Sequence, residues 1–156
     1  MIGEITMNII GKQCEQGYNF YEEGHKIYTM TNQSEKGLIR LTLLNQLGYP
    51  VYEVFQLVSW KDRFRKNKYD FAIYEGEEKI AEFTSLKNGY EVEIFGVFYY
   101  LETGTYEDKA CVYVKKNLGD PDIYILDEDI ELRLKYGRNH ALHICFAYLF
   151  NHYLCK

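Results

Sequence analysis

The chain has 156 residues, of which 47% are hydrophobic, and a net charge of −5 at pH 7. This length predicts one domain over residues 1–156, with enough apolar residues to bury a core. The acidic balance argues against a dedicated nucleic-acid-binding protein, because such a protein needs a broad basic surface to meet phosphates. Aromatic residues make up 17% of the chain and include 16 tyrosines, a composition that favours β-strands.

Strand–turn–strand patterns predict a series of antiparallel hairpins from residue 18 onwards. The stretch YNFYEEGHKIYTM is typical, because it combines an aromatic-rich strand, a glycine turn and a returning strand. Asn88-Gly89 is a strong hairpin signal, since a type I′ turn needs two residues that tolerate positive φ. We expect about ten strands, including the short segments 122–126 and 130–134, and no domain boundary. The other expected turns lie at Gly24, Gly48, Gly76 and Gly104.

A basic stretch stands out against the acidic chain, with five basic residues and one acid between Lys61 and Lys68. Aromatic residues are interleaved with the basic ones, a composition that suits the headgroup zone of an anionic membrane. A simpler interpretation is a solvated hairpin connection whose long basic side chains lie over the strands. The candidate ligand-binding residues are Trp60, Lys61, Arg63, Arg65, Lys66 and Lys68.

A second charged stretch, DEDIE at residues 127–131, is acidic. Asp127, Asp129 and Glu131 alternate, so a strand would place them on one face, where carboxylates could bind Ca²⁺. The stretch lacks the spacing and the glycine of an EF-hand loop. We therefore interpret it as the charged edge of a sheet, since charge on an edge strand discourages aggregation.

Residues 139–154 predict a helix, with Gly137 as a break and Asn139 as a candidate N-cap. Apolar side chains point in all directions around this helix, so it is either buried on all sides or placed in a membrane. Polar residues interrupt an apolar stretch of only 16 residues, which is too short and too polar for a membrane span. Burial inside the protein is the interpretation that remains.

The histidines and cysteines of this segment raise the alternative of a metal site. His140 with His143, and His152 with Cys155, are each spaced i, i+3, so each pair could supply two ligands. The two pairs lie about 18 Å apart along a helix, however, and a closed zinc site needs four ligands. We expect no metal, with the histidines at the helix ends or bonded to a buried carbonyl or a tyrosine hydroxyl.

Together these elements predict a mainly β fold, in which antiparallel hairpins form a β-barrel or barrel-like sheet around one hydrophobic C-terminal α-helix. An eight-stranded barrel is filled by its own side chains, whereas a ring of about ten to twelve strands is wider and needs a filler. A helix without a polar face is a suitable one. Closure also removes the strand edges that an open sheet would expose.

Hairpins of the type YDFAIYEGEEKIAEF, followed by a last strand and the apolar helix HALHICFAYLF, resemble the tubby C-terminal-like superfamily, in particular its LURP-one-related branch. The resemblance is one of pattern over residues 18–155, and it transfers no functional residue. It implies a closed antiparallel barrel around a C-terminal hydrophobic helix. The superfamily includes phospholipid scramblases and the phosphoinositide-binding tubby proteins, although the acidic net charge here departs from what a strong lipid binder would show.

The sequence contains no phosphate-binding loop, dinucleotide fingerprint, nucleophile elbow or HExxH motif, so we expect neither an enzyme nor a cofactor. A Cys–His nucleophile could be imagined from Cys145 and His152, but both lie on the helix that we expect to be buried. Three hypotheses follow. The first is a non-enzymatic peripheral binder of anionic lipid headgroups, the second a protein-interaction domain of the inhibitor or immunity type, and the third an enzyme without a recognisable motif.

The N-terminal residues do not form the pattern of a secretory signal. We therefore expect a cytoplasmic protein, peripheral at the membrane if it binds lipid, whose cysteines are reduced and mostly buried. The sequence indicates neither the identity of a partner nor the oligomeric state.

Overall fold

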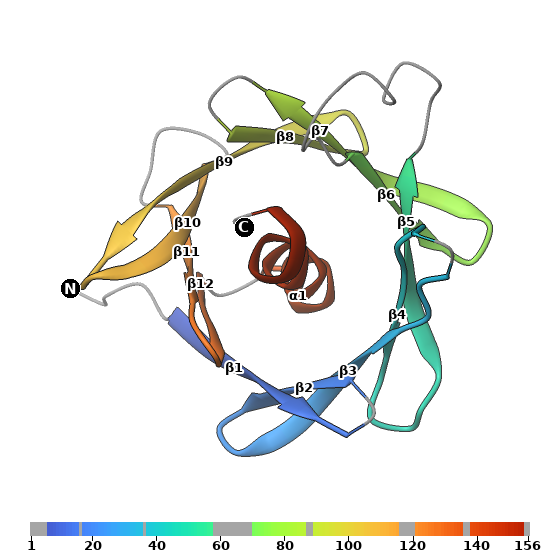
Figure 1. Ribbon diagram of the computed structural model, residues 1–156, viewed down its shortest axis with the longest axis horizontal. Coiled ribbons are helices and arrows are strands. Elements are labelled where there is room, and N and C mark those ends of the chain that lie inside the picture. The colour runs from blue at the N-terminus through green and yellow to red at the C-terminus, as the bar shows by residue number, and fades with distance from the viewer. Residues whose placement is uncertain are drawn as a thin grey trace.

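The computed structural model describes residues 6–15, 17–35, 37–57, 70–86, 89–115, 121–135 and 138–154. Within these residues, antiparallel strands β1 to β12 form a closed barrel, and the C-terminal helix lies inside the ring (Figure 1). The predicted fold class, a β-barrel with one hydrophobic helix packed in its centre, is therefore confirmed.

Each strand pairs with its neighbours in the chain. The strands are β1 (Thr6–Cys14), β2 (Gly17–Glu22), β3 (His25–Asn32), β4 (Arg40–Leu44), β5 (Pro50–Leu57), β6 (Asp70–Glu75), β7 (Glu78–Leu86), β8 (Gly89–Ile94), β9 (Val97–Tyr106), β10 (Lys109–Lys115), β11 (Asp122–Leu126) and β12 (Ile130–Lys135). The helix α1 spans His140–Leu149 and continues as the π-helical turn η2 over Phe150–Leu154.

The first strand closes the ring, because β1 pairs with β2 on one side and with β12 on the other. Our strand predictions began only at residue 18 and did not include it. Gly11 lies within this strand and interrupts its apolar alternation. Phe20 of β2 covers that glycine so closely that a Cβ there would lie 2.6 Å from its ring. The small residue is thus required by packing, and it weakens the sequence signal.

Closure also corrects our interpretation of the acidic stretch as a sheet edge. Asp127 and Asp129 lie in the turn between β11 and β12, and Glu131 lies in β12, which is paired on both sides. The carboxylates are partly compensated by neighbours, since Lys109 Nζ lies 3.5 Å from Asp127 and Arg133 Nε lies 3.2 Å from Glu131.

Most of the predicted glycine turns are confirmed, with Gly24, Gly48 and Gly76 between consecutive paired strands. β7 and β8 also form the predicted hairpin, although Asn88 lies outside the described residues.

The predicted turn at Gly104 is wrong, because this residue lies inside β9 opposite Cys111. The β9–β10 turn is formed instead by Glu107 and Asp108, both with positive φ. Gly104 is there for packing: the ring of Tyr113 lies over it, 2.8 Å from where a Cβ would stand.

The helix begins as predicted at Asn139, whose side-chain oxygen accepts a hydrogen bond of 3.1 Å from the Leu142 amide. The side-chain Nδ2 of Asn139 also donates a hydrogen bond of 2.9 Å to the Tyr52 hydroxyl of β5, so the N-cap residue connects the helix to the barrel wall. Gly137 lies outside the described residues.

Every side chain from Ala141 to Phe150 is at most 5% exposed, so the helix has no solvent face along this length. Its rings contact opposite parts of the wall, with Phe146 5.0 Å from Phe83 of β7 and Tyr148 5.8 Å from Tyr18 of β2 between ring centroids. The prediction of a helix buried on all sides is confirmed. None of the helical segments that the structure describes has the length and apolar character that crossing a membrane requires.

Replacing Phe146 by Ala is expected to lower the free energy of unfolding by about 3–5 kcal/mol, because the side chain is fully buried between the helix and β7. Phe98→Ala is the matched control, since that aromatic side chain lies on the outside of the barrel at 45% exposure and should cost far less. Urea unfolding measures both values. Equal losses for the two variants would contradict a core organised around the helix.

Candidate functional site

Several buried polar groups have partners within the protein. The Tyr124 hydroxyl lies 2.5 Å from His143 Nδ1, and both side chains are buried. The Asp122 carboxylate accepts hydrogen bonds of 2.9 Å from the Lys135 amide and from Arg138 Nε. These internal hydrogen bonds indicate that the groups serve the structure of the barrel.

Burial changes the acid–base chemistry of these groups. It lowers the pKa of His143 to about 4, because the charged imidazolium loses its water. The Asp122 carboxylate acts in the opposite direction on that pKa, whereas Arg138 and His140 add to the lowering. The pKa of Tyr124 is raised, again mainly by burial. Both groups are therefore neutral near pH 7.

The imagined Cys145–His152 nucleophile has the wrong surroundings. Burial raises the pKa of the Cys145 thiol, so the reactive thiolate does not form near neutral pH. His152 Nδ1 lies 3.1 Å from the Tyr148 carbonyl oxygen, and its ring stacks on Tyr148 at 3.9 Å between centroids. Of the described cysteines, Cys111 and Cys145 are buried and Cys14 is partly so.

Two histidines of the helix have the kinds of partner that we expected. His143 meets a tyrosine hydroxyl and His152 a backbone carbonyl, while His140 Nδ1 lies 3.9 Å from Glu22. Cys155 lies outside the described residues. Among the residues that are described, no group of three or more His, Cys, Asp or Glu side chains is arranged to hold a metal ion.

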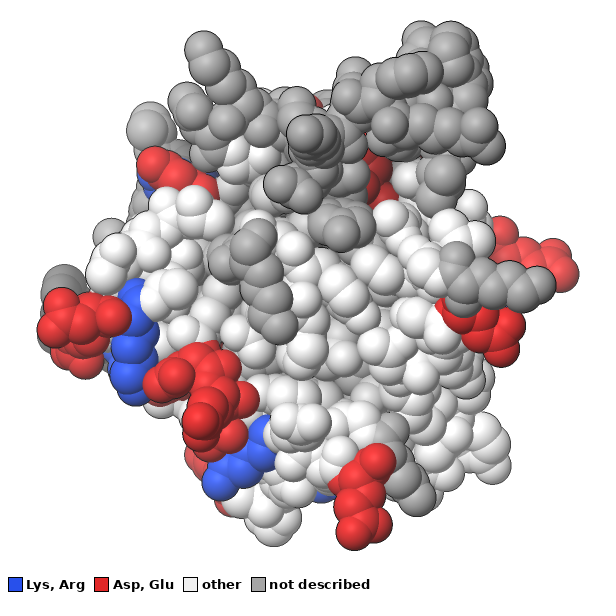
Figure 2. Space-filling model, in the orientation of Figure 1, with Lys and Arg blue, Asp and Glu red and all other residues white. Residues whose placement is uncertain are grey.

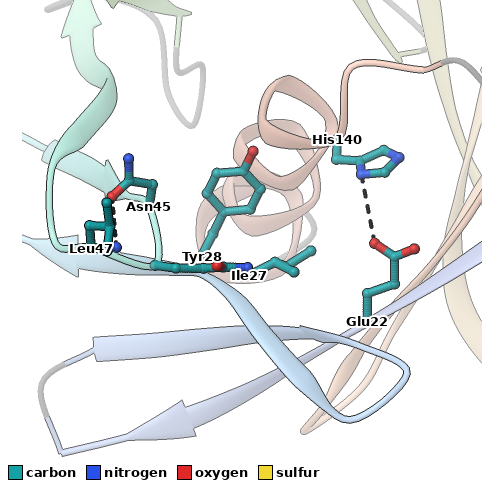
Figure 3. A pocket seen from close by; sticks show the side chains of 7 residues that line it. Glu22, Ile27, Tyr28, Asn45, Leu47 and His140 are labelled. Atoms are coloured by element: carbon teal, nitrogen blue, oxygen red, sulfur yellow. Dashed lines mark hydrogen bonds and ion pairs between the residues drawn. The ribbon is translucent and has the colours of Figure 1, made fainter.

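A small pocket of about 290 Å³ opens at the barrel end where the helix begins. Figure 3 shows His140 and Glu22 facing each other across it, with the Tyr28 ring directed towards the helix. Asn45 also lines the pocket. Its side-chain Oδ1 accepts a hydrogen bond of 2.9 Å from the backbone amide of Leu47 and so stabilises the β4–β5 turn. Among the described lining residues there is no Ser, Thr, Cys or Lys, so the pocket offers the carboxylate of Glu22 and the imidazole of His140 but no hydroxyl–histidine or thiol–histidine pair of a hydrolase.

Sequence reasoning missed this pocket because its lining comes from separate strands, a turn and the first residue of the helix. No local motif joins these residues. Its volume is at the lower limit of ligand pockets, so it carries little argument for a small-molecule site.

The predicted basic site, Trp60, Lys61, Arg63, Arg65, Lys66 and Lys68, lies outside the described residues. The strands that flank it are described, and Leu57 of β5 pairs with Asp70 of β6. This barrel end is also where the helix ends, because Tyr153 lies 6.2 Å from Phe71 between ring centroids and its hydroxyl accepts from Asn32 at 3.0 Å. Figure 2 views this end, where the described charged side chains lie around the rim and uncharged ones lie towards the middle.

The outer wall carries a further feature that the sequence analysis did not single out. Phe95, Phe98 and Tyr100, around the β8–β9 turn, are 71%, 45% and 50% exposed. Exposed aromatic side chains in one place are unusual for a monomeric surface and often mark a contact region.

Comparison of the chain with protein-family models, with curated proteins and with solved structures finds no match. The resemblance to tubby-like proteins therefore remains a proposal.

The lowered pKa of His143 predicts a pH-dependent stability. A histidine whose pKa is lower in the folded state contributes its full stability above the unfolded pKa of 6.5 and loses it as pH falls towards about 4. Lowering the pH from about 7.5 to about 5 should therefore remove about 2 kcal/mol from the free energy of unfolding. His143→Gln, which does not titrate, should remove this part of the pH dependence in urea unfolding.

His25→Gln is the matched control, because His25 is exposed at the start of β3. A pH dependence that is unchanged in His143→Gln, or that is lost equally in both variants, would contradict a buried neutral His143.

Proposed function

We propose that the protein is a non-enzymatic binding domain that recognises its ligand with its outside surface. The observation that carries this proposal is the filled interior: the side chains from Ala141 to Phe150 occupy the space inside the ring and are buried. Barrels that enclose a ligand need a cavity of some hundreds of cubic ångströms. Here the helix occupies that position, which leaves the ends and the outer wall for recognition.

The proposed ligand is an anionic phospholipid headgroup, bound by the basic stretch between β5 and β6. The described flanks support this, because both strands reach the barrel end at which the described side chains towards the middle are uncharged (Figure 2). Each basic residue near an anionic membrane contributes about 1 kcal/mol, so five of them suffice for weak peripheral attachment. Arginine can grip a phosphate through two parallel hydrogen bonds, which makes Arg63 and Arg65 the proposed headgroup contacts.

The tubby-like resemblance is part of this proposal. A closed barrel around a C-terminal helix is the architecture that the resemblance implies, and lipid headgroups are ligands within that superfamily. The expected cytoplasmic location also suits this ligand, since the cytoplasmic leaflet carries anionic lipids.

A protein-interaction domain is the second candidate, favoured by the exposed aromatic side chains around the β8–β9 turn. Tyr and Phe are enriched at protein interfaces because they bury a large area at a small entropic cost. A membrane ligand gives no account of these side chains, because the carboxylates beside them, Glu91 and Glu93, would repel anionic lipid.

Vesicle co-sedimentation tests the lipid proposal. The wild-type protein should bind phosphatidylserine vesicles weakly at low salt. It should dissociate from them as the salt concentration rises, because salt screens the attraction between basic side chains and anionic lipid. Arg63→Glu with Arg65→Glu should abolish this binding and leave the melting temperature nearly unchanged.

The matched control is Lys26→Glu with Lys79→Glu, which changes the net charge equally at the barrel end opposite to Leu57 and Asp70. If this control abolishes binding as well, net charge alone explains the result and the proposed site is wrong. If the wild-type protein does not bind such vesicles at low salt, the lipid proposal fails.

A further inference from the structure

Three exposed aromatic side chains form one outward surface at the β8–β9 hairpin, which we name the β8–β9 aromatic surface: Phe95, Phe98 and Tyr100. Phe98 and Tyr100 alternate along β9 with Tyr99 and Leu101, which pack against the core. Because side chains alternate across a strand, Phe98 and Tyr100 must point away from the barrel. Phe95 stands in the turn that precedes them.

The fold does not need an aromatic residue at Phe95. Its φ is +49° and that of Gly96 is +81°, a pair of positive values for which turns prefer Asn-Gly or Asp-Gly. The side chain is 71% exposed, so it adds little to the core. A large apolar residue stands here where a small polar one would serve the turn better.

The charges on β8 beside the aromatic surface are acidic. In the antiparallel register, Glu93 lies opposite Phe98, and Glu91 lies opposite Tyr100. Of the described lysines nearby, Lys79 pairs with Glu82 at 2.8 Å, and Lys115, which lies opposite Tyr100 on β10, pairs with Glu102 at 2.5 Å. Among the described residues, neither Glu91 nor Glu93 has a cationic partner within ion-pair distance.

A shallow depression lies beside Phe95 and Glu93, at one end of this surface. It has a volume of about 220 Å³, and Glu82 and Glu93 line it together with Phe95. Lys79 lies in the same lining, paired to Glu82. The depression is large enough for the end of one long side chain and far smaller than the usual pocket for an organic ligand.

We propose that the β8–β9 aromatic surface docks a partner protein that presents arginine side chains. A guanidinium group can stack on the face of a tyrosine or phenylalanine ring while its N–H groups donate to a carboxylate. Phe98 with Glu93, and Tyr100 with Glu91, each place a ring beside a carboxylate across the two strands. This inference rests on the proposal that the protein is a binding domain, and it names the partner class for the second candidate.

Charge complementarity selects this occupant over the alternatives. Glu91 and Glu93, which form no ion pair with the described residues, disfavour an anionic membrane or a nucleic acid, because both bring further negative charge. They equally disfavour contact between two copies of this same surface, since a twofold interface would place like charges together.

A fluorescein-labelled octa-arginine peptide is the probe, and fluorescence anisotropy measures its affinity for the full chain. Phe98→Ser with Tyr100→Ser should weaken binding by about tenfold or more, although it leaves every charge in place. The matched control is Leu47→Ser with Tyr49→Ser, which removes exposed apolar side chains of 81% and 64% exposure from the β4–β5 turn. This control should bind like the wild type.

Carboxylate variants test the second half of the site. Glu91→Gln with Glu93→Gln should weaken peptide binding by about tenfold or more and flatten its salt dependence. The control is Glu15→Gln with Glu107→Gln, which changes the net charge equally at exposed positions away from the surface. Backbone amide shifts of the labelled protein should change on β8 and β9 when the peptide is added.

Phe95→Asn separates binding from folding, because the two effects have opposite signs. The turn should gain from asparagine at a positive φ, so the melting temperature should rise, while peptide affinity falls. If the melting temperature and the peptide affinity both fall, Phe95 supports the fold, and it would no longer belong to the proposed docking surface.

Several outcomes overturn the inference. They are no peptide binding at all, equal binding by the serine variant and its control, or amide shifts centred on the 127–129 turn. Dimers in sedimentation velocity that dissociate on Phe98→Ser with Tyr100→Ser would assign the surface to a second copy. Loss of phosphatidylserine-vesicle binding in that variant would assign it to lipid.

The lipid proposal and this inference can fail separately. If wild-type vesicle binding does not depend on Arg63 and Arg65 but peptide binding is intact, this inference stands.

Discussion

The central constraint in this molecule is a helix that has no polar face. From Ala141 to Phe150 each side chain is buried, so apolar or aromatic groups must surround the helix on all sides. A two-layer packing covers only one side of a helix, whereas a closed ring of strands covers all of them. The ring has the matching need, because a barrel of this width is not filled by its own side chains. The ring of strands covers the helix on all sides, and the helix fills the inside of the ring.

This mutual requirement determines where recognition can occur. With the interior filled by rings such as Phe83, Phe146 and Tyr148, the few polar groups inside must satisfy one another, as Tyr124 and His143 do. Such groups stabilise a unique arrangement of the core, but they are inaccessible to a ligand. The outer wall and the two ends therefore remain for binding, and their charges differ. The basic stretch follows β5, whereas carboxylates flank the exposed rings of β8 and β9.

Particular residues show why some local predictions were right and others wrong. Gly24, Gly48 and Gly76 were read correctly as turns, because positive φ in a short connection is a local requirement. Gly104 was misread, since its small size serves the close approach of the Tyr113 ring from the next strand. Gly11 is likewise small for packing, under the ring of Phe20. A sequence does not reveal whether a glycine is there for its φ or for its missing Cβ.

The amino-acid sequence by itself determined the hairpins, the capped C-terminal helix and the need to bury that helix on every side. Those properties depend on turn chemistry, alternation and helical periodicity, which act over a few residues. Only the tertiary structure decided that β1 closes the ring, that the 127–131 stretch lies in a paired strand and its turn, and that Glu22 meets His140. It also decided that Phe98 and Tyr100 face solvent beside Glu91 and Glu93. These outcomes depend on strand order and register, which join residues far apart in the chain and leave no local signal.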